Sequence, residues 1–368
     1  MSIKTRVVVG MSGGVDSSVA AYLLQQQGYE VIGVTLKVWS DSCLSHSQEK
    51  CCGPQSISDA RLVAHRLGIP YFVLDEAEAF EEEVISPFVK AYQGGRTPNP
   101  CVLCNEKMKF GRLPQKAKAW GAEYVATGHY ARIEHTAEGA MLKRAKEERK
   151  DQTYFLFRLE RKTLARMLTP LGDYTKEEVR NIARKAGLSV WDKEESQGIC
   201  FVPGNQYGAF LTKRIGKGKD DAGQIVDLSG RCLGRHRGIE FYTVGQRRGI
   251  PGGQGEPLYV LTIDPAQQRI VVGPWEALHQ THCFLSETNW QQQPPPTPLS
   301  VAVKVRYNYP PSPARLTVLS GQRARLDFES PQAGVAPGQA AVCYVDDLLL
   351  GGGWIERPTG EGQEEVTP

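Results

Sequence analysis

Short apolar runs alternate with amphipathic stretches through the first half of the chain. Apolar runs of strand length, rich in valine, occupy positions 7–9, 30–36, 71–74 and 124–127. Stretches that favour helices separate them, at positions 19–24, 58–67, 79–92 and 106–120. Pro87 predicts a kink in the third of these helices. The alternation of strand and helix predicts a doubly wound α/β domain with a parallel sheet.

The pattern changes after about residue 201, where glycine and proline become frequent and helical periodicity fades. Short strand-like runs at 225–226 and 238–244 predict a small mixed or β central module. Alternating runs at 301–307, 324–328 and 341–345 predict an antiparallel β-barrel. We therefore expect an N-terminal α/β domain over 1–205, a small central domain over 206–285, a barrel over 286–358 and a disordered tail over 359–368.

The most informative local feature is the turn between the first strand and the first helix, Gly10-Met11-Ser12-Gly13-Gly14-Val15-Asp16-Ser17. A helix N-terminus that follows a Gly-rich turn is a typical phosphate site. Gly13 and Gly14 allow positive φ and close backbone approach, and Ser12 and Ser17 add hydroxyl donors. The Asp16 carboxylate suits a Mg²⁺ ion that bridges phosphate oxygens.

Composition limits the alternatives without choosing between them. The net charge is only +3, so affinity for nucleic acid must come from local basic clusters. No apolar run approaches the ~20 residues that a membrane span needs. We expect no signal peptide, because a core strand follows almost at once. The chain has nine cysteines, which in this context indicate a reducing, cytoplasmic location. We also expect a monomer.

The cysteines are the second source of candidate chemistry. Cys101 and Cys104 form a CxxC, and Cys200 lies in a glycine turn far downstream. Lysines in the helix that follows Cys104 favour a lowered thiol pKa. A group near His46 (Cys43, Cys51 and Cys52) matches no zinc spacing, so structural thiols are favoured there. The last three cysteines, Cys232, Cys283 and Cys343, occur in strand-like runs and are expected to be buried.

Several motifs together carry a family resemblance. The opening loop lacks the Gly-Lys-Ser/Thr ending of a Walker A motif and resembles the SGGxDS loop of the PP-loop ATP pyrophosphatases. Further segments occur in the order found in the tRNA-specific 2-thiouridylases, at 96–105 (RTPNPxxxCN), 126–130, 150–156, 198–201, 306–307, 337–339 and 350–353. The resemblance covers roughly nine-tenths of the chain.

This resemblance implies an adenine nucleotide α-hydrolase-like fold, ATP and Mg²⁺ as cofactors, and tRNA as substrate. ATP would bind the loop at Gly10, Met11, Ser12, Gly13, Gly14, Val15, Asp16 and Ser17, with Leu36 and Gly128 near the adenosine. Adenylation of the C2 oxygen of a wobble uridine would precede sulfur transfer. Cys200 would carry a persulfide sulfur received from a sulfur-relay protein or a cysteine desulfurase. Cys104 would either attack the persulfide to free sulfide or form a disulfide with Cys200 as the thiolated base forms. Asp16 would complete the catalytic set.

The same resemblance implies a set of tRNA-binding residues: Asn99, Pro100, Cys101, His129, Lys150, Asp151, Gln152, Arg306, Tyr307 and Gln339. Basic clusters such as Lys213–Arg214 and Arg247–Arg248 suit an extended RNA backbone. For His129, a role as catalytic base and a role in positioning tRNA or the strand end both stay open.

Three alternatives remain at this stage. Cys101, Cys104 and Cys200 could hold three irons of a [4Fe-4S] cluster, which would run the same thiolation by another route. A second alternative is a PP-loop enzyme that adenylates a small molecule and needs no cysteine pair. A third is an RNA-binding protein without catalysis, which the Asp16 carboxylate argues against because binding alone requires no metal ligand.

Overall fold

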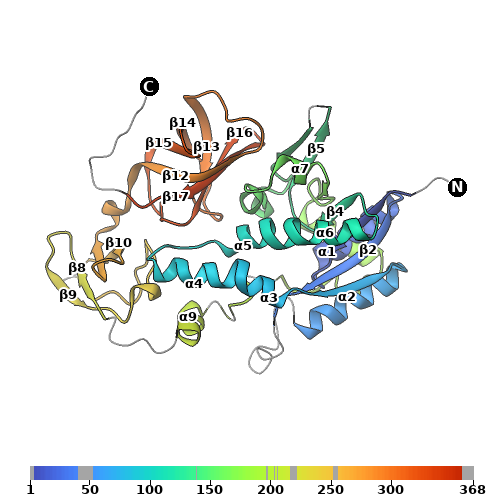
Figure 1. The fold of residues 1–368 in the computed structure, drawn as a ribbon, viewed down its shortest axis with the longest axis horizontal. Helices are drawn as coiled ribbons and strands as arrows, with labels where there is room; N and C mark the ends of the chain where they lie inside the picture. Colours follow the sequence, from blue (N-terminus) through green and yellow to red (C-terminus); the bar gives the residue numbers. More distant parts are fainter. Residues whose placement is uncertain are drawn as a thin grey trace. The chain divides into compact units, whose positions relative to one another are not determined.

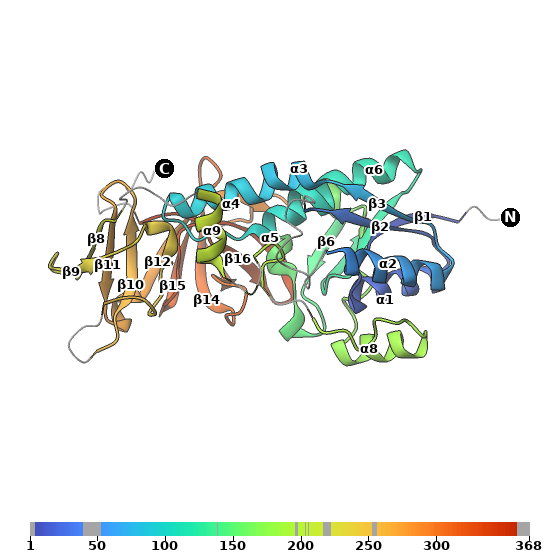
Figure 2. The same ribbon diagram turned by 90° about the horizontal axis from the view of Figure 1, so that it is seen from below.

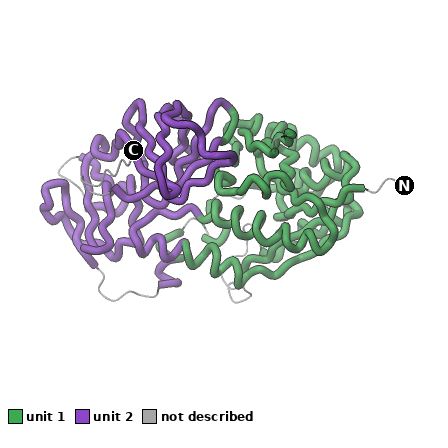
Figure 3. The backbone as a smooth tube through the Cα atoms, turned by 45° about the horizontal axis from the view of Figure 1, so that its top comes forward, with its two compact units in different colours: residues 1–87, 100–210, 347–349 green, residues 88–99, 211–346, 350–368 purple. Residues whose placement is uncertain are grey.

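The computed structural model describes residues 4–39, 53–137, 139–195, 198–202, 204, 206–215, 222–251 and 256–358. The expected tail at 359–368 and the group of Cys43, His46, Cys51 and Cys52 lie outside these residues. Backbone contacts divide the chain into two compact units (Figure 3). Unit 1 comprises residues 1–87, 100–210 and 347–349, and unit 2 comprises residues 88–99, 211–346 and 350–368.

Unit 1 is built on a five-stranded sheet in the order β3-β2-β1-β4-β7, with every neighbouring pair parallel (Figure 1). Its strands are β1 (Arg6–Gly10), β2 (Glu30–Lys37), β3 (Tyr71–Asp75), β4 (Tyr124–Thr127) and β7 (Met167–Leu168). The order reverses direction at β1, from which the chain moves first to β2 and β3 and later to β4. The predicted doubly wound parallel sheet is therefore confirmed.

Helices cover both faces of this sheet (Figure 2). One face carries α1 (Val15–Gln26), α2 (Pro54–Leu67) and α8 (Lys176–Lys185), and the other carries α3 (Ala77–Phe80) and α6 (Leu113–Ala119). Val7 and Val9 join the core under α1, α2 and α8. The intervening Val8 is fully buried as well and, by strand alternation, belongs to the opposite face. Burial on both faces explains the uninterrupted valine run.

Two helical segments differ from the sequence prediction. The expected helix at 79–92 is α3 followed by a π-helix, η2 (Glu81–Ile85), and by α4 (Ser86–Gln93). Pro87 has no N–H to donate to the preceding turn, so the ordinary helical pattern cannot be kept there. The expected helix at 106–120 begins earlier, as α5 (Pro100–Leu103) and a second π-helix, η3 (Cys104–Arg112), and ends with α6.

The sequence prediction missed a hairpin and α8. The remaining elements of this part of the chain are β5 (Arg132–Thr136), β6 (Gly139–Lys143), η4 (Glu148–Lys150), η5 (Thr153–Leu156), α7 (Arg161–Leu164) and α9 (Tyr207–Ile215). The start of α8 did carry a local signal. Thr175 and Glu178 form a capping box, in which each side chain accepts the other residue's backbone N–H.

Unit 2 contains a four-stranded sheet in the order β10-β11-β8-β9. Its strands are β8 (Gln224–Val226), β9 (Cys232–Arg235), β10 (Tyr259–Asp264) and β11 (Arg269–Gly273). The prediction of a strand at 238–244 is wrong, because residues Ile239–Phe241 form a 3-10 turn, η7. Gly238 adopts φ +127° there, and its N–H donates to Nδ1 of His236 at 3.0 Å. The chain therefore turns at the position where a strand would begin.

The second part of unit 2 is a closed barrel that confirms the predicted antiparallel fold. After η8 (Trp275–Leu278) come β12 (Gln280–Trp290), β13 (Leu299–Lys304), β14 (Ser312–Leu319), β15 (Arg323–Gln332), β16 (Ala340–Val345) and β17 (Leu348–Ile355). Pairing of β12 with β17 closes the circle. Cys283 and Cys343 are buried in its core, as expected, whereas Cys232 on β9 is exposed. None of the described helices combines the length and apolarity of a membrane span.

Candidate active site

In the loop between β1 and α1, one of the two glycines adopts the positive φ that the sequence led us to expect. Gly13 adopts φ +71°, and a Cβ atom there would clash with the Ser56 carbonyl oxygen at the start of α2. Gly14 is the N-cap of α1 with an extended φ of −100°, so it needs no glycine-specific conformation. Gly13 is therefore the position where a side chain is excluded.

The serine hydroxyls fasten the loop to the first turn of the helix. The Ser12 N–H donates to Oγ of Ser17 at 3.1 Å, and Oγ of Ser18 donates to the Gly14 carbonyl at 2.8 Å. The first N–H groups of any helix lack partners within the helix and favour an anion. This terminus is therefore preorganised as a phosphate site.

The residues predicted near the adenosine gather at the same edge of the sheet. Gly10 at the end of β1 pairs with Val34 of β2 and with Thr127 of β4. Leu36 follows near the end of β2 and is half-buried. A Cβ on Gly128 would lie 2.7 Å from the Ser17 nitrogen, so the backbone after β4 touches the first turn of α1. Ligands of open α/β sheets bind beyond these strand ends. Contact with adenosine stays a prediction.

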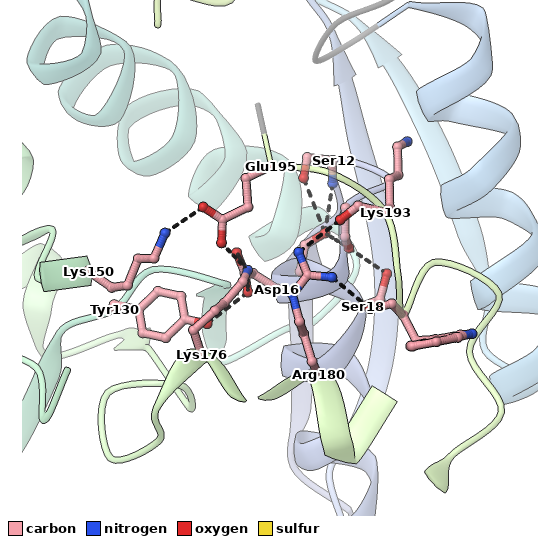
Figure 4. Close-up of polar contacts among 12 residues, drawn as sticks. Ser12, Asp16, Ser18, Tyr130, Lys150, Lys176, Arg180, Lys193 and Glu195 are labelled. Carbon is pink, nitrogen blue, oxygen red and sulfur yellow. Dashed lines mark hydrogen bonds and ion pairs between the residues drawn. The ribbon is translucent and has the colours of Figure 1, made fainter. Parts of the chain in front are cut away.

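A network of charged side chains surrounds Asp16 (Figure 4). Nζ of Lys176 lies 2.7 and 2.8 Å from the two Asp16 carboxylate oxygens. The Tyr130 hydroxyl donates to Oδ1 of Asp16 at 2.9 Å. Lys176 also pairs with Glu195 at 2.9 Å, and Glu195 pairs with Lys150 at 2.5 Å. The structure thus gives Asp16 two direct partners, Lys176 and Tyr130, and a third residue, Glu195, linked to it through Lys176; sequence reasoning assigned none of the three to this site.

The environment sets the protonation of two members of this network. Burial, and then the adjacent Asp16 charge, raise the pKa of Tyr130, so its hydroxyl keeps its proton and remains a donor. Burial alone would raise the pKa of Glu195, but hydrogen bonds from Lys150 and Lys176 outweigh it and hold that pKa below its usual value. Glu195 is therefore a carboxylate at neutral pH.

A second lysine contacts the loop backbone directly. Nζ of Lys193 donates to the Gly13 carbonyl at 3.0 Å and pairs with Asp59 of α2 at 2.5 Å. The Arg180 guanidinium on α8 donates to the carbonyls of Trp191 and Lys193 at 3.0 and 3.1 Å. The segment from Trp191 to Glu195 is consequently anchored both to α8 and to the phosphate loop.

The residues present fit one role for Mg²⁺. A magnesium ion beside ATP needs only one or two protein carboxylates, because phosphates and water complete its coordination. Asp16, at the N-terminus of α1, supplies one such carboxylate. Among the described residues, no three His, Cys, Asp or Glu side chains lie close enough together to hold a metal ion. The remaining ligands of the ion would therefore come from the nucleotide and water.

His129, Asp151 and Gln152 lie beside this network in largely structural contacts. His129 is buried, its Nδ1 lies 2.7 Å from the Thr127 hydroxyl, and burial holds its pKa well below the usual value. The buried Asp151 carboxylate accepts from the Ala145 N–H at 3.1 Å and from Thr153. Gln152 accepts from the Tyr130 N–H at 3.0 Å. Their contact with tRNA, and that of Lys150, stays a prediction.

The two candidate sulfur-handling cysteines differ in environment. Cys200 is exposed, whereas Cys104, the first residue of π-helix η3, is only partly exposed. Burial raises the pKa of the Cys104 thiol, and Lys109 offsets this only in part. The expectation of a lowered pKa is therefore wrong, because desolvation of the sulfur outweighs the nearby lysine charge. Pro100 beside it is buried and Cys101 half-buried. All three cysteines are described, and they do not form a metal-binding group.

We expect Cys104 to react more slowly with iodoacetamide at pH 7 than an exposed cysteine does, because burial raises the pKa of its thiol and so lowers the fraction of reactive thiolate. The rate should rise with pH through and beyond the ordinary thiol range. Peptide mass spectrometry of alkylated protein measures it, with exposed Cys232 as the internal reference. Equal rates for Cys104 and Cys232 at pH 7 would contradict this assignment.

The remaining residues predicted to bind tRNA belong to unit 2. The Arg306 guanidinium donates to the carbonyls of Gly334 and Val244 at 2.8 and 3.0 Å, and so joins the barrel to the four-stranded part of the unit. Nζ of Lys304 lies 5.7 Å from the Tyr307 ring centre. Gln339 donates to the Thr97 carbonyl at 2.9 Å and holds the segment that ends at Asn99. Contact of these residues with tRNA stays a prediction.

The fold and the loop define a class of protein: an α/β protein whose first strand, glycine turn and helix form a phosphate site without a Walker lysine. Family models match along most of the chain. They are described as the tRNA methyl transferase HUP domain over residues 5–204, the tRNA methyl transferase PRC-barrel domain over 208–274 and the aminomethyltransferase beta-barrel domain over 280–355.

Curated relatives identify the family. The chain is 47% identical over 352 residues to the tRNA-specific 2-thiouridylase MnmA of Acidithiobacillus ferrooxidans, covering 95% of this chain and 98% of the relative. It is 46% identical to that of Geobacter metallireducens, covering 98% and 99%. It is 44% identical to MnmA 1 of Clostridium botulinum, covering 96% and 100%. The chain belongs to the tRNA-specific 2-thiouridylase family.

Proposed function

We propose that this protein converts the wobble uridine of tRNA to 2-thiouridine at the expense of ATP. The observation that carries the proposal is the loop at Gly13 and Asp16, preorganised for phosphate, in a chain whose relatives bear the name tRNA-specific 2-thiouridylase. The loop accounts for the nucleotide, and the exposed Cys200 accounts for the sulfur.

The first step is adenylation. The C2 oxygen of the uridine attacks the α-phosphorus of ATP, and pyrophosphate leaves. The C2 oxygen is then bonded to the phosphorus of AMP. It can leave C2 as part of AMP, which is a far better leaving group than oxide. The loop N–H groups and the Lys176 and Lys193 ammonium groups are the chain's own means of holding the phosphates. Bound Mg²⁺ would add charge neutralisation next to Asp16.

The second step transfers sulfur. The terminal sulfur of a Cys200 persulfide attacks C2, and AMP departs with the C2 oxygen. The Cys104 thiolate then attacks Sγ of Cys200, which breaks the persulfide S–S bond, leaves the sulfur on C2 and joins the two cysteines in a disulfide. A thiol reductant restores both thiols. The exposure of Cys200 suits loading by a sulfur-donor protein, either a relay protein or a cysteine desulfurase.

Incubation with unmodified tRNA, ATP, Mg²⁺ and a persulfide donor tests the proposal. We expect 2-thiouridine in the nucleosides after digestion, with one pyrophosphate released per thiolated base. Omission of ATP is the control. A parallel reaction with S-adenosylmethionine in place of ATP and sulfur examines methyl transfer, which the family-model description names. Pyrophosphate release on a small acid, without thiolated tRNA, would favour a small-molecule ligase instead.

The iron–sulfur alternative predicts a different composition of the active protein. A [4Fe-4S] cluster on Cys101, Cys104 and Cys200 requires the three sulfurs to come together, and the described residues hold no such group. We favour the persulfide route, which requires only two of these sulfurs, those of Cys104 and Cys200, to meet. Iron and sulfide analysis of anaerobically purified protein decides: iron-free protein that thiolates tRNA at full rate excludes the cluster, and activity that follows iron content supports it.

A further inference from the structure

The Lys176 ammonium is shared between two carboxylates that come from distant parts of unit 1. Asp16 lies in the first turn of α1, and Glu195 lies beyond α8 in the segment that follows Trp191. Nζ of Lys176 contacts both Asp16 oxygens at 2.7 and 2.8 Å and one Glu195 oxygen at 2.9 Å (Figure 4). The Lys176 side chain is only 13% exposed. An ammonium has three protons to donate, so these contacts use its whole capacity.

Glu195 precedes Cys200 by five positions in the sequence. Its ion pairs with Lys176 and Lys150 hold the segment that begins at Trp191. The segment is held by Arg180 at two carbonyls, by Lys193 at the loop and at Asp59, and by Glu195 at Lys176 and Lys150. The chain that leads to the exposed cysteine is thus fastened to the groups that surround the phosphate loop.

Phosphates on the loop would compete with Glu195 for Lys176. They bring several negative charges to the N-terminus of α1, where Asp16 and Lys176 lie, and such charges attract the nearest ammonium and repel the nearest carboxylate. Both carboxylates keep another donor if Lys176 turns to a phosphate. Asp16 retains the Tyr130 hydroxyl at 2.9 Å, and Glu195 retains Lys150 at 2.5 Å. Transfer of Lys176 to a phosphate therefore leaves neither carboxylate without a donor.

We propose that Glu195 is a positioning residue that competes with the ATP phosphates for the Lys176 ammonium, so that nucleotide binding loosens the segment that leads to Cys200. This inference rests on the proposed function, because it assumes that ATP occupies the loop. It couples the two half-reactions: residues 191–195, which precede Cys200 in the chain, are held more firmly while the phosphate loop is empty and are loosened once ATP is bound.

The test compares Glu195→Gln with the wild-type protein in binding a non-hydrolysable ATP analogue with Mg²⁺. Glutamine keeps the size of the side chain but competes poorly for an ammonium. Because coupling between two sites is reciprocal, the variant should bind the analogue about fivefold more tightly, at the low end of ordinary coupling. Glu194→Gln is the matched control. It removes the same charge at the neighbouring position, where the side chain is exposed. It should change affinity less than about twofold.

Hydrogen exchange of the peptide covering 191–195 supplies the second readout. The N–H groups of Trp191 and Lys193 donate to the carbonyls of Leu188 and Val190 at 3.2 and 3.1 Å. Their protection from hydrogen exchange therefore reports on this segment. The analogue should speed their exchange in the wild type about fivefold. In the Glu195→Gln variant these N–H groups should exchange fast even without the analogue, and binding of the analogue should speed their exchange little further.

The outcomes separate this inference from the function beneath it. Slower or unchanged exchange of the segment when the wild-type protein binds the analogue overturns the coupling, and so does equal affinity of Glu195→Gln and Glu194→Gln. A wild-type protein that does not bind the analogue at all refutes the proposed use of ATP, and the inference with it. If Glu195→Gln does not fold, the exchange measurement on wild-type protein alone decides.

Discussion

Cys200→Ser should abolish 2-thiouridine formation, by at least about a thousandfold, while pyrophosphate release with tRNA continues. A hydroxyl cannot carry a transferable sulfur, but it leaves the phosphate loop intact. The tRNA adenylate should therefore accumulate, or be hydrolysed slowly with release of AMP. Nucleoside analysis measures the thiolated base, and labelled ATP follows AMP and pyrophosphate.

Cys232→Ser is the matched control for this change, because Cys232 is also exposed and lies on β9 in the other unit. It should thiolate at the wild-type rate. Full thiolation by Cys200→Ser would show that Cys200 does not carry the persulfide. Loss of both thiolation and pyrophosphate release would show that Cys200 contributes to the first half-reaction as well.

Gly13→Ala should reduce ATP-dependent activity by at least about a hundredfold, which corresponds to roughly 2.7 kcal/mol. Alanine at φ +71° is strained, and its methyl group would clash with the Ser56 carbonyl oxygen in the first turn of α2. The loop must then shift away from the geometry that holds phosphate. Equilibrium binding of an ATP analogue measures the loss, and a thermal melt shows whether the variant is folded.

Gly14→Ala is the comparison that isolates the cause. Gly14 has an extended φ of −100°, and the nearest atom to an added Cβ would be Oγ of Ser12 at 3.6 Å. The variant should lose no more than about fivefold in affinity, as expected for an alanine at an N-cap. Equal losses for the two variants would mean that any side chain in the loop blocks the nucleotide, and the backbone argument at Gly13 would fail.

Local patterns predicted much of the fold because they report on short-range physics. The valine run of β1 is buried on both faces, and Gly68 ends α2 with φ +64°. Both features could be expected from residue type and spacing along the chain, because an unbroken valine run is typical of a strand covered on both faces and glycine is typical of a helix C-terminus. The same reasoning failed at 238–244, where Gly238 and His236 make a turn inside a run that has strand composition. It also missed α8, although the capping box at Thr175 and Glu178 was readable in the sequence.

The candidate site was predictable only in part. The sequence indicated Asp16 and the glycine loop, because strand, turn and helix are contiguous there. Lys176, which pairs with Asp16, lies 160 positions away, so no local pattern connects the two. The thiol of Cys104 shows the same limit. Its lysines are visible in the sequence, but the burial that raises its pKa comes from packing around η3.

The sequence by itself determined the alternation of strands and helices, the glycine turn that suits phosphate, and the cysteines that can handle sulfur, since each depends on residue type and short spacing. The tertiary structure alone decided which of the two glycines excludes a side chain, which cation pairs with Asp16, and which of Cys104 and Cys200 is exposed. These properties arise where segments far apart in the chain meet. Steric exclusion, ion pairing and desolvation depend on distances in space, which residue order does not specify.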